Sequence, residues 1–166
     1  MRVRIPPRAL TVRAATRDDA PAIAEIHVAS WRAGYRGLVA DEILAGLSVE
    51  QRRETWETIV GDGRTTVLVA GEPPAGFVAF LADGGEIGAP YVDPERFRAG
   101  VGSALLEAAH EAIERAGRDE AVLWVLAGNE PAFAFYARHG YAPDGATAPD
   151  ESTGRERVRL ARQTRR

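Results

Sequence analysis

The sequence predicts a mixed α/β fold, a single domain with the element order β-α-α-β-β-β-α-β-α-β-β. Two observations support this order. Short runs rich in β-branched and aromatic residues alternate with stretches in which apolar residues recur at helical spacing. Three β-rich runs follow one another in the middle of the chain with only turns between them, whereas the later strands are separated by helices. The central strands therefore form a meander, and the strand–helix–strand unit after them forms a crossover within one mixed sheet. A length of 166 residues suits one core of this kind.

The first part of the chain contains one strand followed by two helices. Residues 11–16, TVRAAT, predict the strand. The acids after Thr16 predict the start of a helix whose apolar positions keep helical spacing as far as Gly34. The second helix begins after Ser48, which opens a Ser-x-x-Gln capping box, and extends to about Val60.

The meander follows these helices. Residues 65–70 and 76–82 are β-rich runs on either side of the turn sequence GEPPA, which predicts a hairpin. Residues 86–93, EIGAPYVD, predict the fourth strand. Because Pro90 inside this strand cannot donate a hydrogen bond to a neighbour, we expect a bulge or an unpaired position there.

A helix, a strand and a second helix come next. The apolar stripe over residues 101–113 predicts a long helix that ends near Gly117. Residues 121–127, AVLWVLA, predict a buried fifth strand. The segment NEPAFAFYARHG predicts a short helix that Asn129 caps.

Two strands complete the sheet and leave a basic segment at each end of the chain. One strand begins at Tyr141, and in the other, arginines alternate with apolar residues up to Leu160, which predicts an edge strand. We therefore expect a single domain over residues 11–161. Residues 1–10 are expected to be a disordered basic extension, and residues 162–166 a basic tail.

Composition excludes several kinds of site. The chain has no cysteine, so it has no disulfide framework, thiolate zinc site or cysteine nucleophile, and a reducing, cytoplasmic location is expected. Every basic residue is arginine, which excludes a lysine Schiff base. The three histidines show no metal-binding spacing, so we expect no metal. A net charge of −3 and the lack of a long apolar run give no reason to expect a nucleic-acid or membrane partner.

The segment PERFRAGVGSALLEAA is the first candidate site. Gly100 and Gly102 lie at the start of the predicted helix, where unpaired N–H groups and the helix dipole attract phosphate. A Walker loop is excluded because the chain has no lysine, and Leu105 occupies the place of the third glycine in a dinucleotide fingerprint. Arg96 and Arg98 add positive charge. From this loop alone, a pyrophosphate site and a simple helix cap are equally consistent with the sequence.

A second segment, NEPAFAFYARHGY, lies one strand further on, and the two together resemble the GCN5-related N-acetyltransferase (GNAT) superfamily over about residues 11–161. The acetyl-CoA motif of that family, Gln/Arg-x-x-Gly-x-Gly/Ala, follows a strand that ends in a Val-x-Pro-like stretch, here residues 92–94. Two positions depart from the pattern: Phe97 stands where the motif has Gln or Arg, and Pro90 where an aliphatic residue is usual. The later family segment is matched by Asn129, Ala132, Phe135, Tyr136, Gly140 and Tyr141.

The resemblance implies a GNAT-like fold in which the fourth and fifth strands splay apart and acetyl-CoA lies in the gap. The first turn of the helix would hold the pyrophosphate, and Asn129 would hydrogen-bond the pantetheine arm. Main-chain groups of the fourth strand would align that arm like an added strand. Arg98, with Arg96 in reserve, is expected to supply the charge that Phe97 lacks. The implied acetyl-CoA contacts are Tyr91, Val92, Arg96, Arg98, Ala99, Gly100, Val101, Gly102, Ser103, Ala104, Asn129, Ala132 and Phe135.

The implied reaction is direct acetyl transfer from acetyl-CoA to a primary amine of a small molecule or peptide. Tyr136 is expected to donate a hydrogen bond to the departing sulfur, because full proton transfer to a free thiolate is uphill by roughly 2 kcal/mol. Glu86 is the expected general base, and Asp93 is the second candidate. Ser30, Trp31 and Tyr35 are candidate acceptor contacts, although the usual placement of aromatic residues favours core packing for the latter two.

Two other functions fit parts of the same pattern. A non-catalytic acyl-CoA-binding sensor or scaffold domain needs the glycine loop and Asn129 but not Tyr136, and the presence of Tyr136 therefore favours an enzyme. An interaction module would use the glycine loop only as a helix cap. A homodimer is consistent with the resemblance.

Overall fold

The computed structural model describes residues 10–96 and 99–164. The strands are β1 (Val12–Ala14), β2 (Thr66–Ala70), β3 (Gly76–Leu81), β4 (Glu86–Ile87), β5 (Tyr91–Val92), β6 (Glu120–Leu126), β7 (Ala142–Asp150) and β8 (Arg155–Gln163). The helices are α1 (Ala20–Gly34), α2 (Asp41–Ala45), α3 (Val49–Asp62), α4 (Val101–Arg115) and α5 (Glu130–Arg138). The short helix α2 lies in a stretch that the sequence analysis did not separate from its neighbours.

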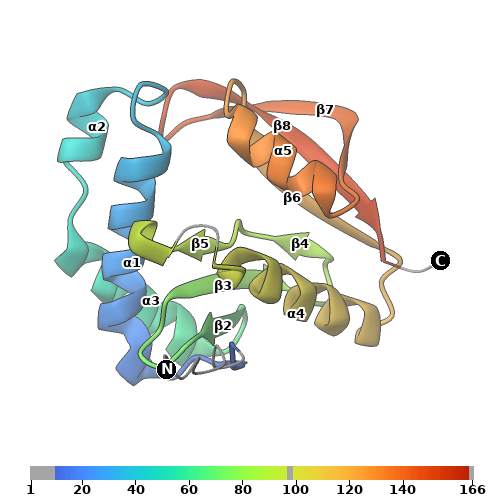
Figure 1. Cartoon of the computed structure of the whole chain (residues 1–166), viewed down its shortest axis with the longest axis horizontal. Helices are drawn as coiled ribbons and strands as arrows, with labels where there is room; N and C mark the ends of the chain where they lie inside the picture. The colour runs from blue at the N-terminus through green and yellow to red at the C-terminus, as the bar shows by residue number, and fades with distance from the viewer. Residues whose placement is uncertain (1–9, 97–98, 165–166) are drawn as a thin grey trace, which may run out of the picture.

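All eight strands belong to one sheet of order β1-β2-β3-β4-β6-β8-β7, with β5 pairing to β3 beside this path (Figure 1). The pairing of β4 with β6 is parallel, and the other pairings are antiparallel. The sheet is therefore mixed, with the meander and crossover that the sequence predicted.

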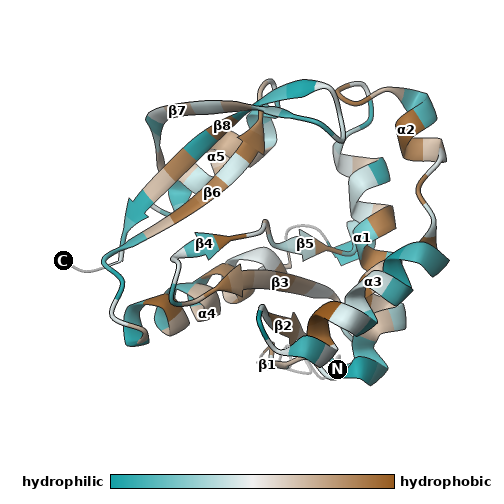
Figure 2. Cartoon of the chain, turned by 180° about the vertical axis from the view of Figure 1, so that it is seen from behind, coloured by the Kyte–Doolittle hydropathy of each residue, from teal (hydrophilic) through white to brown (hydrophobic). Residues whose placement is uncertain are grey.

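The first four strands in this order pack helices on both faces because their side chains alternate. Val69 and Phe77 are opposite each other in the register and pack with Trp56 of α3. Val78, the next residue along β3, instead packs with Leu105 of α4. Accordingly, α4 lies in front of these strands in Figure 1, whereas the reverse view in Figure 2 brings α1 and α3 forward.

A one-residue bulge divides the predicted fourth strand into β4 and β5. On β3, two residues separate Phe77 from Phe80, but three separate their partners Tyr91 and Ile87. The extra residue lies in the segment that contains Pro90, so the expected bulge is confirmed. It redirects β5 relative to β4.

Beyond this bulge β5 diverges from β6, which is the splaying of the fourth and fifth strands that the resemblance implied. Glu86 of β4 pairs with Val122 of β6, and the Val122 N–H donates to the Gly85 carbonyl over 2.8 Å. In the described chain β5 pairs with β3 alone. The edge of β5 that faces β6 is therefore free of strand partners, and Figure 1 shows the two strands well separated.

Gly76 allows α4 to approach this region closely. A Cβ atom at this position would lie 2.8 Å from Val101 Cγ1 and 2.9 Å from the Tyr91 carbonyl oxygen, both shorter than real Cβ contacts. The absence of a side chain at Gly76 thus sets how closely the start of α4 packs on β5.

The last strand differs from its prediction. β8 lies between β6 and β7 and is not an edge strand, so that prediction was wrong. The edge is β7, which contains Pro143 and Pro149, residues that edge strands tolerate. β8 also continues to Gln163, and Leu10 packs against the main core, so the packed region extends beyond both ends of the expected 11–161 domain.

None of the described helices has the length and apolar character needed to cross a membrane.

Candidate active site

A cleft of about 770 Å³ opens where β5 and β6 diverge. This volume is within the range of small-molecule and cofactor sites. Its walls come from the end of α1, the bulge before β5, the first turn of α4, the middle of β6 and the whole of α5. The lining residues are Ser30, Trp31, Ala33, Gly34, Tyr35, Ala89, Pro90, Tyr91, Val92, Arg96, Gly100, Val101, Gly102, Ser103, Trp124, Val125, Asn129, Pro131, Ala132, Phe135, Tyr136 and Arg138.

Most of the predicted site residues meet in this cleft, although they come from elements far apart in the sequence. Ala99 and Ala104 are next to lining residues but do not line the cleft themselves, and Glu86 lies away from it. Arg98 and the unusual Phe97 lie outside the described residues. The residues brought together are Ser30, Trp31, Tyr35, Tyr91, Val92, Arg96, Gly100, Val101, Gly102, Ser103, Asn129, Ala132, Phe135 and Tyr136.

The start of α4 presents free backbone donors to the cleft. Gly100 is the N-cap and adopts a left-handed conformation with φ 79°, which glycine tolerates without strain. No side chain caps this helix, and its first turn contains no acid. A Cβ at Gly102 would face Phe135 Cζ at 3.4 Å and Val92 Cγ2 at 3.6 Å. The first-turn N–H groups, which have no partner within a helix, are therefore available to an anion, and Arg96 adds a positive charge to the same wall.

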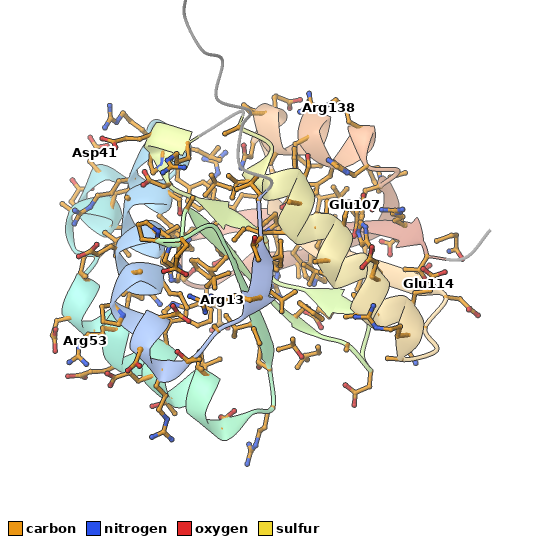
Figure 3. The ribbon with its side chains drawn as sticks, turned by 60° about the horizontal axis from the view of Figure 1, so that its bottom comes forward. Arg13, Asp41, Arg53, Glu107, Glu114 and Arg138 are labelled. Carbon is orange, nitrogen blue, oxygen red and sulfur yellow. The ribbon has the colours of Figure 1, made fainter. Side chains whose placement is uncertain are left out.

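A hydrogen-bonded group of side chains connects this turn to α5. The Ser103 hydroxyl lies 3.0 Å from His139 Nε2, and Glu107 Oε1 lies 3.5 Å from His139 Nδ1. Figure 3 labels Glu107 on α4 and Arg138, the residue before His139, at the end of α5. These contacts fix the glycine turn relative to α5, whose residues form the opposite side of the cleft.

The cleft contains main-chain and side-chain groups suited to an extended ligand. The unpaired edge of β5 supplies the backbone of Tyr91 and Val92. Asn129 lines the cleft and also caps α5, because its Oδ1 accepts from the Ala132 N–H over 3.4 Å. The cap fixes the Asn129 oxygen and leaves its amide NH₂ group as a donor.

Tyr136 is almost completely buried, with 4% of its surface exposed, yet it borders the cleft. Its ring packs edge-on against Phe135 and Tyr141, at centroid distances of 5.2 and 5.7 Å. Burial raises the pKa of the Tyr136 hydroxyl well above its ordinary value near 10, and the neighbouring tyrosines act in the same direction. The phenol is therefore neutral at neutral pH and keeps its O–H proton available for donation.

The end of α1 forms the far wall of the cleft. Trp31 and Tyr35 contact each other edge-on, with ring centroids 4.9 Å apart, and both also pack against the small core around Leu126. Burial raises the pKa of the Tyr35 hydroxyl. Ser30 donates to the His27 carbonyl over 3.1 Å. Core packing and cleft lining are therefore combined in these residues.

The two acids proposed as a base are not placed for that role. Glu86 is exposed at the beginning of β4, where β4 and β6 are still paired and leave no gap. Asp93 accepts from the Glu95 N–H over 3.0 Å and so closes the turn before α4. No aspartate or glutamate lines the cleft in the described chain. The geometry therefore gives no support to Glu86 as the base.

Sequence reasoning missed several lining residues. Trp124 looked like any residue of a buried strand, although alternation along β6 places it opposite the core residues Leu123 and Val125. Pro131 adjoins the predicted Ala132, and Ala89 and Arg138 lie two positions from the predicted Tyr91 and Tyr136, so position in the motif was the only signal for them. Arg138 carries a positive charge at the rim near Phe135, whose ring centroid lies 5.9 Å from its guanidinium carbon.

Known sequences show which protein family has this architecture. The family model of the acetyltransferase (GNAT) domain matches residues 62–143. YuaI, an uncharacterised N-acetyltransferase of Bacillus subtilis strain 168, is 30% identical over 145 residues, covering 81% of this chain and 80% of the relative. A mycothiol acetyltransferase from Clavibacter sepedonicus is 44% identical over 69 residues, covering 40% of this chain and 23% of the relative.

Solved structures share the fold. PaiA N-acetyltransferase from Thermoplasma acidophilum, in complex with coenzyme A, matches with a TM-score of 0.77 and 20% identity over 93% of this chain and 99% of that one. YncA, a putative acetyltransferase from Salmonella typhimurium with acetyl-CoA, matches with a TM-score of 0.69 and 20% identity over 95% of both chains.

Together, the splayed sheet, its cleft and these relatives define an acetyl-CoA-dependent acetyltransferase. The chain belongs to the GNAT family of acetyltransferases, as the two sequence motifs indicated.

Proposed function

We propose that the chain transfers the acetyl group of acetyl-CoA directly to a primary amine of a small molecule or peptide. The observation that carries the proposal is the convergence of three donor groups on one cleft: the first turn of α4, the free edge of β5 and the Tyr136 hydroxyl. A direct reaction is favoured because no residue of the described cleft lining is a cysteine, lysine or carboxylate that could carry the acetyl group, and because Ser103, which pairs with His139, lies in the first turn of α4 where the pyrophosphate would bind.

The residues of the cleft would divide the binding of acetyl-CoA among them. The N–H groups of Val101, Gly102 and Ser103, with Arg96, would hold the pyrophosphate. The backbone of β5 and the amide of Asn129 would hold the pantetheine arm, and a β5 N–H would polarise the thioester carbonyl. Arg98, which lies outside the described residues, remains the proposed additional charge.

Tyr136 would act at the departing sulfur. Its raised pKa makes proton transfer to a thiolate more unfavourable than the roughly 2 kcal/mol expected for an ordinary tyrosine. The hydroxyl would therefore stabilise the developing thiolate by hydrogen bonding, and the thiolate would leave without taking the proton.

The acceptor nitrogen would lose two protons to solvent, one when the ammonium becomes the free amine and one after it has bonded to the thioester carbonyl carbon and the C–S bond breaks. Presenting a free alkylamine at pH 7 costs about 4–5 kcal/mol, since its pKa is about 10.4. With no carboxylate in the described cleft lining to share this cost, kcat/KM should rise about tenfold per pH unit until the amine is deprotonated.

Two measurements test the proposal. Acetyl-CoA at about 100 times its dissociation constant should add about 2.7 kcal/mol of stability, equivalent to roughly 5–11 °C in Tm for a chain of this size. Thiol release from acetyl-CoA should then depend on an added amine in a screen across amine classes. Stabilisation without thiol release from any amine would instead indicate a binding domain, and absence of stabilisation would reject the cleft as a CoA site.

A further inference from the structure

Arg157 of β8 has no partner that neutralises its charge among the described residues. Arg157 is half-buried on β8, and its guanidinium carbon lies 4.5 Å from the ring centroid of Trp124. Its Nε atom is buried and has no hydrogen-bond partner. No ion pair joins Arg157 to any residue of the described chain.

The neighbouring arginine on the same strand is already neutralised. Arg159 lies 5.9 Å from the same Trp124 ring, but its Nε donates to Asp144 Oδ2 over 2.6 Å. The two arginines share strand, face and aromatic neighbour, and they differ in whether a carboxylate binds them. This difference provides a matched control.

The sheet register places Arg157 beside the acceptor end of the cleft, directly behind lining residues rather than among them. Leu126 is its direct partner on β6, and Trp124 lies two residues away on the same face. Trp124 lines the cleft, and Leu126 packs in one cluster with Trp31 and Tyr35, which also line it. In Figure 2 this face of β6 and β8 is turned towards the viewer, with α5 behind the strands.

The unsatisfied groups in this region are all donors. Within the described chain, the buried side-chain nitrogen and oxygen atoms without a hydrogen-bond partner are Trp31 Nε1 and Arg157 Nε. Trp31 Nε1 lies near the Tyr91 hydroxyl, which its hydrogen bond influences, whereas Arg157 has neither a hydrogen-bond acceptor at Nε nor an ion-pair partner among the described residues. A planar guanidinium is especially suited to a carboxylate or phosphate, which it can bind through two parallel hydrogen bonds.

The acid Asp150, which acts on the same region, does not neutralise Arg157 in any contact of the described residues. Asp150, at the end of β7, acts electrostatically on Tyr35 and Tyr91 and is opposite Arg155 in the register. Its Oδ1 accepts from the backbone of Ser152 and Thr153. Arg155 itself makes only a 3.5 Å contact with the Ala127 carbonyl.

We propose that Arg157 binds an anionic group of the acceptor, so that the substrate is a primary amine that also carries a carboxylate or a phosphate. This inference rests on the proposed amine acetylation. Trp124 lines the cleft, and its ring holds the guanidinium next to that wall. The acceptor amine then extends from this anchor towards the thioester.

The test compares amines that differ in their anionic group. L-phenylalanine is measured against L-phenylalaninamide, and O-phosphoethanolamine against ethanolamine, by thiol release from acetyl-CoA. The acidic member of at least one pair should have a kcat/KM at least tenfold higher. Because the amide has the less basic amine, amine basicity favours the amide and cannot produce a preference for the acid.

Variants then assign the preference to Arg157. R157Q should lower the acid-to-neutral ratio at least tenfold, mainly through KM, and R157K should retain part of it. R159Q, in the neutralised neighbour, should leave the ratio unchanged. The stabilisation by acetyl-CoA, measured for each variant, checks that the cofactor site is intact, and the comparison of amines in the natural protein needs no variant to fold.

Calorimetric binding of the same four amines to the CoA-bound protein separates the two proposals. If amines are acetylated without preference for acids, or if R159Q lowers the ratio as much as R157Q, the inference is overturned and amine acetylation stands. If no amine releases thiol but the acids bind and R157Q abolishes binding, the anion subsite stands and the proposed acetylation fails. If the acids neither react nor bind, the subsite is rejected.

Discussion

Replacing Tyr136 by phenylalanine removes one hydroxyl and almost nothing else. The ring is 4% exposed and packs against Phe135 and Tyr141, contacts that the phenylalanine ring retains. The hydroxyl is not needed to hold the fold, because no hydrogen bond to it is present in the described structure. We therefore expect a native-like variant whose defect is confined to chemistry.

The size of the expected loss of kcat follows from the environment of the Tyr136 hydroxyl. Desolvation keeps the phenol neutral and removes competing water, so its hydrogen bond to a developing thiolate forms in a medium of low polarity. Losing one such preorganised donor typically lowers kcat by about 10²–10³, or about 2.7–4 kcal/mol of transition-state stabilisation. The affinity for acetyl-CoA should change less than threefold, because this hydrogen bond strengthens only as the thiolate forms.

The assay is steady-state thiol release with an amine that the screen has identified as an acetyl acceptor. Calorimetric titration with CoA accompanies it. Tyr141→Phe is the matched control. Tyr141 is equally buried, but its hydroxyl pairs with His110 Nε2 over 2.6 Å and does not line the cleft. That variant should lose about 1–2 kcal/mol of stability and keep its kcat. An unchanged kcat in Tyr136→Phe, or equal losses in both variants, would refute the role at the sulfur.

Three further predictions concern stability and cofactor binding. Burial lowers the pKa values of His27 and His110 to about 4, from an ordinary 6.5, so the folded state favours their neutral forms. The unfolding free energy should therefore be complete above pH 6.5 and fall as the pH drops towards 4, by up to about 3 kcal/mol per histidine, a slope that urea titrations at several pH values will measure. Arg96→Ala should weaken CoA binding about tenfold at low salt, with a smaller effect in 0.5 M NaCl; equal affinity would show that backbone groups alone hold the pyrophosphate. Gly76→Ala should cost about 1–3 kcal/mol of stability because its Cβ meets Val101 and the Tyr91 carbonyl, whereas Gly102→Ala should keep near-normal stability and lose CoA affinity, a contrast that thermal melts with and without CoA will show.

The sequence was informative where a pattern has one physical solution. Proline cannot donate within a strand, and the bulge occurs in the segment that contains Pro90. Asn129 was predicted as a helix cap and as a site residue, and its oxygen and amide can serve both purposes. The motif around Gly100 and Tyr136 likewise predicted residues that the fold brings to one cleft.

It was less informative where long-range pairing decides the outcome. The alternation of arginine with apolar residues in β8 fits an edge strand, but β7 pairs along its outer side and makes β8 internal. The pairing of β8 with β6 brings Arg157 next to Trp124, which lies 33 positions earlier in the chain. No local sequence pattern predicts this contact. Glu86 was chosen for its place on the fourth strand, before the point of divergence between β4 and β6 was known.

The bulge and the charge distribution around the cleft have a common consequence. Because β5 turns away from β6, the cleft is lined by groups that would otherwise be paired inside a sheet or covered by a neighbouring strand. In the described chain these groups include N–H and O–H donors in the first turn of α4 and at Tyr136, and Arg157 lies behind the lining residue Trp124 at the acceptor end. A cleft with donors or positive charge at these three places and no lining carboxylate favours negative charge at each of them. Those charges would be the pyrophosphate, the departing thiolate and the anionic group of the acceptor, so the proposed preference for an acidic amine rests on the same electrostatics that would bind coenzyme A.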